Sequence, residues 1–400
     1  MINKVKGLAS QYFEEVRNIR RYLHQHPELS SEEYNTSKFI SEKLTEYGIN
    51  FKGGIAKTGI LASIEGKNPS KKIIALRADM DALPISEENN VEYKSVNEGV
   101  MHACGHDSHV AILLGCAKIL SSLKNEFEGT IKLIFQPSEE KFPGGAITMI
   151  NEGILDNPKP QSIIAMHVYP NLECGKMGVR KGMYMASTDE IYITVKGKGG
   201  HAATPSLCID PILIASHIIV SLQQIISRNA PSHIPTVLSF GKIIGQGRTN
   251  IIPNEVRIEG TLRTMNESWR SEAQQKINNI AKFTAKGMGG ECDVFIDKGY
   301  PYLVNEENLT ERIKDYSIEY LSKENVEDLE LRMTAEDFAY FSQYAPSCLY
   351  RLGIANSSKG ITSNLHTSTF DIDENSLEKG IGLMAWIAIN ELSINMVDNC

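Results

Sequence analysis

The chain has no long apolar segment and no cluster of basic residues. Its 400 residues include 41 basic and 49 acidic side chains, which leaves a net charge of −8 without any Lys- and Arg-rich run. Nucleic-acid binders neutralise phosphates with clustered cations, so we expect no nucleic-acid partner. We find no apolar run near the ~20 residues that span a bilayer, and no signal-peptide core at the N-terminus. The sequence therefore predicts a cytoplasmic protein without a membrane partner.

Cysteine is also scarce. The seven cysteines are irregularly spaced, at positions 104, 116, 174, 208, 292, 348 and 400. An odd, scattered set does not indicate a disulfide framework, and a reducing compartment is the better interpretation. Most of these residues are expected to be small buried side chains. Cys104 differs because it stands among histidines.

The length predicts two domains. In the N-terminal part, short apolar runs rich in β-branched residues alternate with helical segments, which is typical of an α/β domain with a mostly parallel sheet. The expected strands are Ile73–Leu76, Ile131–Phe135 and Ser162–Met166, and the expected helices include His109–Leu123 and Gly144–Glu152.

A different order of elements follows from about Met183. Between Asp189 and Asp297 the pattern predicts strand, helix, strand, strand, helix, strand, the ferredoxin-like arrangement of a small α+β domain. Beyond Tyr300 the α/β pattern returns. We therefore expect a small domain, residues 184–297, inserted into a larger one formed by residues 1–183 and 298–400.

Polar side chains follow each of the predicted buried strands. Asp79 and Asp81 come after the first strand, Glu139 and Glu140 after the second, and His167 directly after the third. Ligands of open α/β sheets bind beyond the carboxyl ends of the strands. These side chains are thus expected to face one crevice.

The segment MHACGHDSH places Cys104, His106 and His109 near a helix start, with Gly105 permitting a sharp turn. A single residue of this kind is usually a buried cysteine or a hydrogen-bonded histidine. As a group they favour a metal site, because thiolate and imidazole both suit zinc and also accept Mn, Co or Ni.

Glu139 and Glu140 are adjacent, so on extended backbone their side chains point in opposite directions. One could bind a metal while the other faces a bound water as general base. The alternative is an exposed pair in a loop. His167 and His366 are weak evidence taken singly, and an Asp such as Asp81 could orient a histidine that binds metal.

The motifs RADMDALPI, MHACGHDSH, QPSEE, AMHVYP, GGHAATP, TNIIPNEVRIEGTLR, TAEDFAYF and LHTSTFDIDE together resemble the M20 family of metallopeptidases, and specifically its amidohydrolase branch. The resemblance covers nearly the whole chain. It implies a zinc-peptidase-like catalytic domain with an inserted ferredoxin-like domain that acts as a lid and forms a homodimer.

The resemblance also implies roles for particular residues. Two divalent ions (Zn, Mn, Co or Ni) would be held by Cys104, His106, Glu140, His167 and His366. Among the remaining positions, Glu139 matches the general base and Asp81 matches the carboxylate that supports the site. His201 matches a lid histidine that stabilises the oxyanion across the dimer. Asn250 and Arg263 match lid positions near the substrate carboxylate.

The implied activity is hydrolysis of N-acyl-L-amino acids to a carboxylic acid and a free amino acid, by a metal-activated water. An exopeptidase or dipeptidase of the same family is the alternative enzyme. A catalytically silent binding protein is disfavoured by the intact Glu139 and ligand set. A purely structural metal is disfavoured because structural zinc ligands lie close in sequence, whereas these extend from Cys104 to His366.

Overall fold

The computed structural model describes residues 1–394, which form two compact units. The first unit consists of residues 1–182, 304–330 and 337 onward, and the second of residues 183–303 and 331–336. The expected insertion, residues 184–297, falls within the second unit. Cys400 lies outside the described residues, and the other six cysteines are free thiols.

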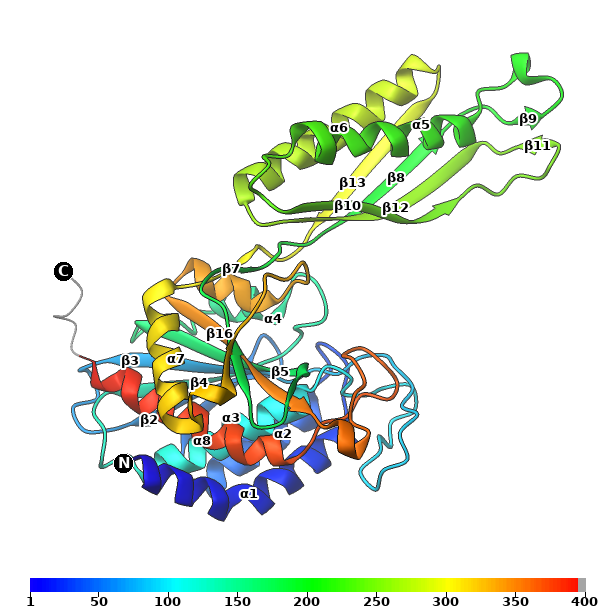
Figure 1. The fold of residues 1–400 in the computed structure, drawn as a ribbon. Coiled ribbons are helices and arrows are strands. Elements are labelled where there is room, and N and C mark those ends of the chain that lie inside the picture. Colours follow the sequence, from blue (N-terminus) through cyan, green and yellow to red (C-terminus); the bar gives the residue numbers. More distant parts are fainter. Residues whose placement is uncertain (395–400) are drawn as a thin grey trace. The chain divides into compact units, whose positions relative to one another are not determined.

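A mixed eight-stranded sheet forms the centre of the first unit (Figure 1). Its order is β1-β2-β4-β3-β5-β16-β6-β15, and the four strands β4, β3, β5 and β16 run parallel. The bounds are β1 Asn50–Ile55, β2 Gly59–Glu65, β3 Ile73–Asp79, β4 Thr130–Gln136, β5 Ser162–Glu173, β6 Met177–Val179, β15 Val326–Asp328 and β16 Ser347–Ala355. The expected α/β fold with a mostly parallel central sheet is confirmed.

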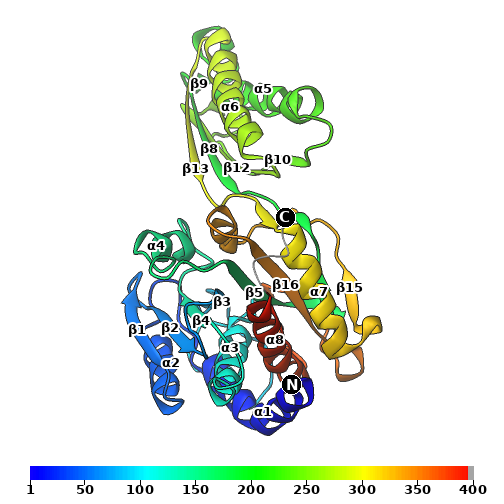
Figure 2. The same ribbon diagram turned by 90° about the vertical axis from the view of Figure 1, so that its left-hand side faces the viewer.

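Helices α1, α3 and α8 pack against one another on one side of this sheet (Figure 2). Helix α3 is the innermost, since it is buried along nearly its whole length. The helices of this unit are α1 Ile2–Gln25, α2 Tyr34–Glu46, α3 His106–Ser122, α4 Gly145–Asn151, α7 Glu307–Leu321 and α8 Asn375–Ser393, with short 3-10 turns at Lys323–Asn325, Asp337–Gln343 and Ser357–Lys359.

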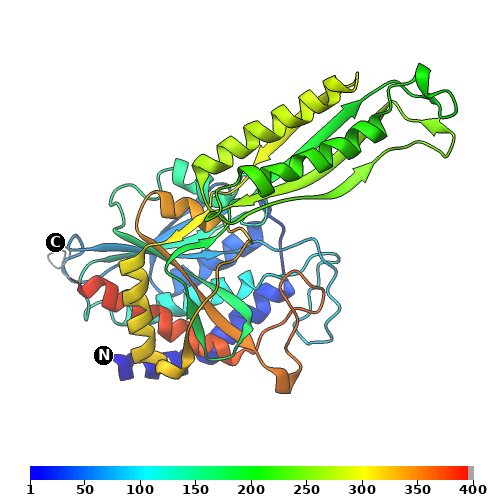
Figure 3. The same cartoon turned by 45° about the horizontal axis from the view of Figure 1, so that its top comes forward.

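The second unit has an antiparallel sheet of order β10-β12-β8-β13, with helices α5 and α6 on one face (Figure 3). Its elements are β8 Asp189–Lys196, α5 Pro211–Gln224, β10 Thr236–Ile244, β12 Glu255–Thr264, α6 Glu267–Gly287 and β13 Glu291–Lys298. This is the expected ferredoxin-like order. Smaller elements of this unit are the paired strands β9 Gly200–His201 and β11 Ile251–Ile252 and the 3-10 turn Pro205–Leu207. The paired strands β7 Gly182–Met185 and β14 Leu303–Asn305 lie where the chain passes from one unit to the other.

Local sequence signals set the starts of both helices in this unit. The Asp210 carboxylate accepts hydrogen bonds from two amides of the first turn of α5, and Pro211 fills the first helical position. The Asn266 side chain caps α6 in the same way, at 2.8 Å from the amide of Trp269. Both helices bury one apolar face against the sheet.

One helical stretch bears on the expectation that no segment spans a membrane. Residues Pro211–Asn229, which comprise α5 and a following π-helical turn, are long and apolar enough to cross a membrane. A third of this stretch is buried within the structure, including Ile214, Ile218 and Leu222, which pack in the core of the second unit. By length and composition alone it is weak evidence for a membrane span, because core helices of soluble proteins pass the same test.

Candidate metal centre

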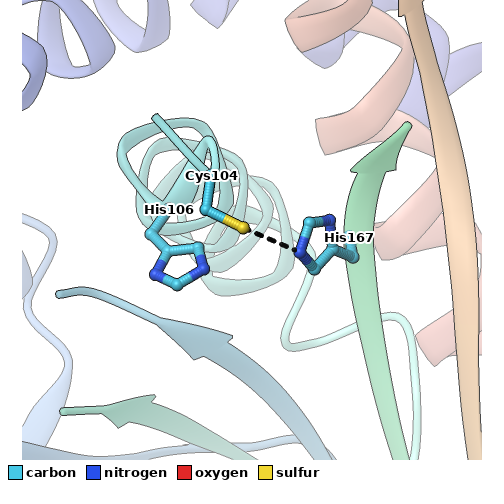
Figure 4. A group of neighbouring side chains, drawn as sticks. All are labelled: Cys104, His106 and His167. Carbon is cyan, nitrogen blue, oxygen red and sulfur yellow. Dashed lines mark hydrogen bonds between the residues drawn. The ribbon is translucent and has the colours of Figure 1, made fainter. Parts of the chain in front are cut away.

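The N-terminal end of α3 carries the first two candidate ligands, Cys104 and His106. Between them Gly105 adopts a left-handed conformation, with φ of +83°, and a Cβ added there would lie 2.5 Å from the Val168 side chain. Only glycine therefore allows the chain to turn into α3 while packing this closely against β5. The turn directs both side chains toward His167, as Figure 4 shows.

His167 comes from β5, the strand that passes this helix end. The sequence predicted that the strand ends at Met166, but β5 continues to Glu173 because β16 pairs with it on one side beyond this point. On its other side the pairing with β3 ends at Ala165. His167 thus lies in the strand, two residues past the last β3 partner. Its Nε2 lies 3.5 Å from the Cys104 sulfur.

The two glutamates lie on the loop after β4, and Asp81 fixes that loop. Its two carboxylate oxygens accept hydrogen bonds from the backbone amides of Glu139 and Glu140, each at 3.0 Å. Ser138, just before them, has a positive φ of 54°, which turns the chain at this point. Burial would raise the pKa of Asp81, yet hydrogen bonds from groups including His106 and Ser30 lower it below its ordinary value.

His366 arrives from a loop more than two hundred residues away in sequence. Its backbone amide donates to the carbonyl of Ala103 at 2.8 Å, so the loop is held beside Cys104. Its Nε2 lies 3.1 Å from Glu140 Oε1. Hydrogen bonding to Cys104 and to Glu140 raises the pKa of His366 to about 10.

All five candidate ligands are therefore brought together, in two groups that share one residue. Ligand atoms of Cys104, His106 and His167 lie within 4.8 Å of one another, and so do those of Cys104, Glu140 and His366. A further group of the same dimensions joins His106 with Glu139 and Glu140. A thiolate common to two donor groups is the arrangement expected of a ligand that bridges two ions.

Hydrogen bonds fix the histidine rings so that one nitrogen faces this cluster. His106 Nδ1 donates to the Asp81 carbonyl at 2.9 Å, and His167 Nδ1 donates to the Val168 carbonyl at 2.7 Å. In neutral rings the lone pair is then at Nε2, the usual state of a histidine that binds metal.

At this cluster the buried His106 Nε2 makes no hydrogen bond within the described residues. Such an orphaned atom costs free energy unless a ligand satisfies it. Nitrogen, sulfur and carboxylate donors around it fit divalent transition ions.

The charges at this cluster respond to burial and to one another. Burial raises the pKa of the Cys104 thiol. Burial also opposes protonation of His106, but Asp79 and Cys104 outweigh it and raise the pKa of that ring well above its usual range. Burial and then Arg351 hold the pKa of His167 well below its ordinary value.

Glu139 is buried next to the cluster, and its Oε1 accepts a hydrogen bond from the backbone amide of Asp337 at 3.3 Å. The sequence analysis gave Asp337 and Arg77 no individual role, and it grouped the buried His109 with the metal-binding segment rather than with Asp79, its hydrogen-bond partner. The available signal for Arg77 was the presence of Arg77 and Asp79 in a strand that is otherwise apolar.

The other three predicted residues belong to the second unit. His201 and Asn250 lie on the β9–β11 ribbon, where His201 pairs with Ile251 and the Asn250 carbonyl accepts the Ala202 amide at 3.0 Å. Both are exposed. Arg263 lies apart from them on β12, and its guanidinium folds back onto Thr261 and the Asp189 carbonyl. Burial lowers the pKa of Arg263.

Comparison with known proteins agrees with this geometry. The family model of peptidase family M20/M25/M40 matches residues 75–390. Thermostable carboxypeptidase 2 of Saccharolobus solfataricus is 38% identical over 97% of this chain and 98% of its own. An N-acyl-L-amino acid amidohydrolase of Geobacillus stearothermophilus is 41% identical over 76% of this chain and 81% of its own. Among solved structures, the Bacillus subtilis YXEP protein, a dinuclear metal-binding peptidase of the M20 family, superimposes with a TM-score of 0.81 at 31% identity over 96% of this chain and 99% of its own.

The family match spans most of the chain, and the donor cluster with its adjoining buried glutamate is consistent with it. The chain therefore belongs to peptidase family M20/M25/M40 and is a metal-dependent hydrolase of amide bonds from the amidohydrolase branch of that family.

Proposed function

We propose that the chain hydrolyses N-acyl-L-amino acids, with acetyl, benzoyl or similar acyl groups, to a carboxylate and a free amino acid. The observation that supports this most is the convergence of Cys104, His106, Glu140, His167 and His366, with Glu139 buried beside them. The similarity to an N-acyl-L-amino acid amidohydrolase supports the choice of substrate.

The proposed cofactor is a pair of divalent ions, Zn, Mn, Co or Ni, held by those five ligands with Cys104 shared. Ions held there would lower the pKa of a bound water and polarise the substrate carbonyl. Glu139 accepts the proton of the attacking water and returns it to the leaving nitrogen. Asp81 keeps Glu139 and Glu140 in place through their backbone amides.

His201 is proposed to stabilise the negative charge that develops on the carbonyl oxygen. Its Nδ1 accepts a hydrogen bond from the Ala203 amide at 3.1 Å, so the neutral ring carries its proton on Nε2 and can donate it. Asn250 lies on the same ribbon and is proposed to bind the substrate carboxylate side together with Arg263. Arg263 would have to leave its present hydrogen bonds to do so.

We further propose a homodimer through the second unit, in which the partner subunit's His201 serves the metal centre. Among the residues that the structure describes, nothing pairs with the outer edges of β10 and β13, the outer strands of the four-stranded sheet. Helix α5 also exposes Ile212, Leu213 and Val220, with Val220 at 72% of its full accessibility. Exposed apolar groups at helical spacing are typical of an interface.

A carboxypeptidase is the second candidate, because two carboxypeptidases of Saccharolobus solfataricus are 38% and 37% identical to this chain over 97% of its length. A panel of acetyl-, benzoyl- and indoleacetyl-amino acids, assayed beside dipeptides and longer peptides with each metal in turn, separates the two. We expect the highest kcat/KM on an N-acyl amino acid. Preference for unblocked peptides would reject the first proposal in favour of the second.

A further inference from the structure

Arg77 is a cation inside the sheet. It lies in β3, is 1% exposed, and directly follows the apolar run Ile73–Leu76. Its guanidinium donates to three side chains: Gln136 Oε1 at 2.8 Å, Asp79 Oδ2 at 2.6 Å and Asp337 Oδ1 at 2.8 Å. A buried cation is tolerated only when it is fully paired, and pairs of this kind often add little to stability compared with apolar residues. The arrangement therefore calls for another explanation.

One arm of this network leads to Glu139. The Asp337 carboxylate, besides Arg77, accepts hydrogen bonds from Gln136 Nε2 at 2.7 Å and from the Ala146 amide at 3.0 Å. Three donors from three segments thus fix this residue in one position. The backbone amide of the same residue donates to Glu139 Oε1. Arg77 consequently helps to hold the peptide that orients the proposed general base.

The other arm leads to His167. Asp79 Oδ1 accepts a hydrogen bond from His109 Nδ1 at 2.5 Å, and His109 Nε2 accepts one from the Val168 amide at 3.0 Å. The His109 and His167 rings lie 4.6 Å apart, edge to face. Because Asp79 accepts from Nδ1 and the Val168 amide donates to Nε2, the His109 ring is held in a single tautomer behind the metal ligand.

We propose that Arg77 is a positioning residue of the metal centre. Its guanidinium fixes the position of Glu139 through Asp337, and it fixes the position of His167 through Asp79 and His109. Strand β3 does not need Arg77 for its own place, since β4 and β5 hydrogen bond it along both edges. The inference rests on the proposed function, because it gives Glu139 and His167 their roles.

Arg77→Lys tests this, because lysine keeps the charge but cannot donate to three partners in a planar fork. The readouts are kcat, KM, affinity for the metal by competition with a chromophoric chelator, and the urea midpoint of unfolding. We expect kcat and the affinity for one of the two ions to fall about 10- to 100-fold, the usual cost of losing a residue that supports a ligand. KM should stay nearly unchanged, since no substrate contact is removed.

Arg270→Lys is the matched control. Arg270 is equally buried, at 1% exposed, and donates to Asp189 and to the Thr188 carbonyl within the second unit. This variant should lower the urea midpoint without changing metal affinity. Gln136→Leu serves if Arg77→Lys does not fold, because it removes a neutral member of the network and strands no charge. Its expected effect is a smaller loss of kcat, again with KM unchanged.

The outcomes separate the two proposals. If the wild-type chain binds two ions, but Arg77→Lys and Gln136→Leu lose only stability, as Arg270→Lys does, the positioning role is overturned. The proposed function is not affected by that outcome. Wild-type chain that binds no divalent ion overturns the proposed function and this inference with it. A selective loss of kcat and metal affinity in Arg77→Lys, absent in Arg270→Lys, supports the inference.

Discussion

The two units differ in where they keep the side chains that could do chemistry. In the first unit the charged groups around the cluster, among them Arg77, Asp79, Asp81 and His106, are almost fully buried and hydrogen bonded to one another. In the second unit, His201 and Asn250 are exposed on a short ribbon. Buried networks hold a donor set rigid before any ligand arrives. The donor set of the first unit is thus held in place by its own hydrogen bonds, whereas the exposed groups of the second unit would act only on a molecule brought to them.

The largest effect should come from the donors of the first unit. His106→Ala and Glu140→Ala each remove a proposed ligand, so we expect loss of one of the two ions and of essentially all turnover. Glu139→Ala should keep the metal but lower kcat by about 10²–10⁴-fold, the usual contribution of a general base. Metal content by mass spectrometry and steady-state kinetics measure both. Full metal content in all three variants would reject the assignment.

A smaller effect is expected from His201 in the second unit. His201→Ala should lower kcat by about 10²–10³-fold, the cost of one oxyanion donor, and leave metal content unchanged. His233→Ala is the control, because His233 is also an exposed histidine of this unit. Unchanged kcat in His201→Ala would show that the exposed ribbon takes no part in the chemistry.

The proposed interface gives a third comparison, within the second unit. Val220→Asp puts a charge on the exposed face of α5 and should convert dimer to monomer, measured by light scattering. Activity should then fall about as far as in His201→Ala, if the histidine acts across the dimer. Phe283→Asp on α6 is the control, since Phe283 is equally exposed, at 71%. An active monomer would remove the role of His201 in the partner's site.

Local patterns were enough to predict most of the fold. The β-branched run Ile131–Phe135 became β4, and the alternation of strands and helices after Asp189 became the ferredoxin-like unit. The hairpin of β1 and β2 was missed, because Asn50–Gly54 is exposed and contains two adjacent glycines, which weakens any strand pattern.

Contacts between distant segments could not be predicted in this way. His366 was weak evidence taken singly, since its approach to Cys104 involves contacts with distant segments, among them the backbone hydrogen bond to Ala103. Arg77 and Asp337 are 260 residues apart, and no periodicity links them. The five ligands were named through the resemblance of motifs, while the supporting network became visible only in three dimensions.

The most direct test of the central claim is the number of ions bound by single-ligand variants. Two donor groups that share Cys104 predict two ions per wild-type chain, one in His167→Ala, one in His366→Ala and none in Cys104→Ala, counted by calorimetric titration of the chelated protein. One ion in the wild type, or one ion retained in Cys104→Ala, would contradict the shared two-metal centre.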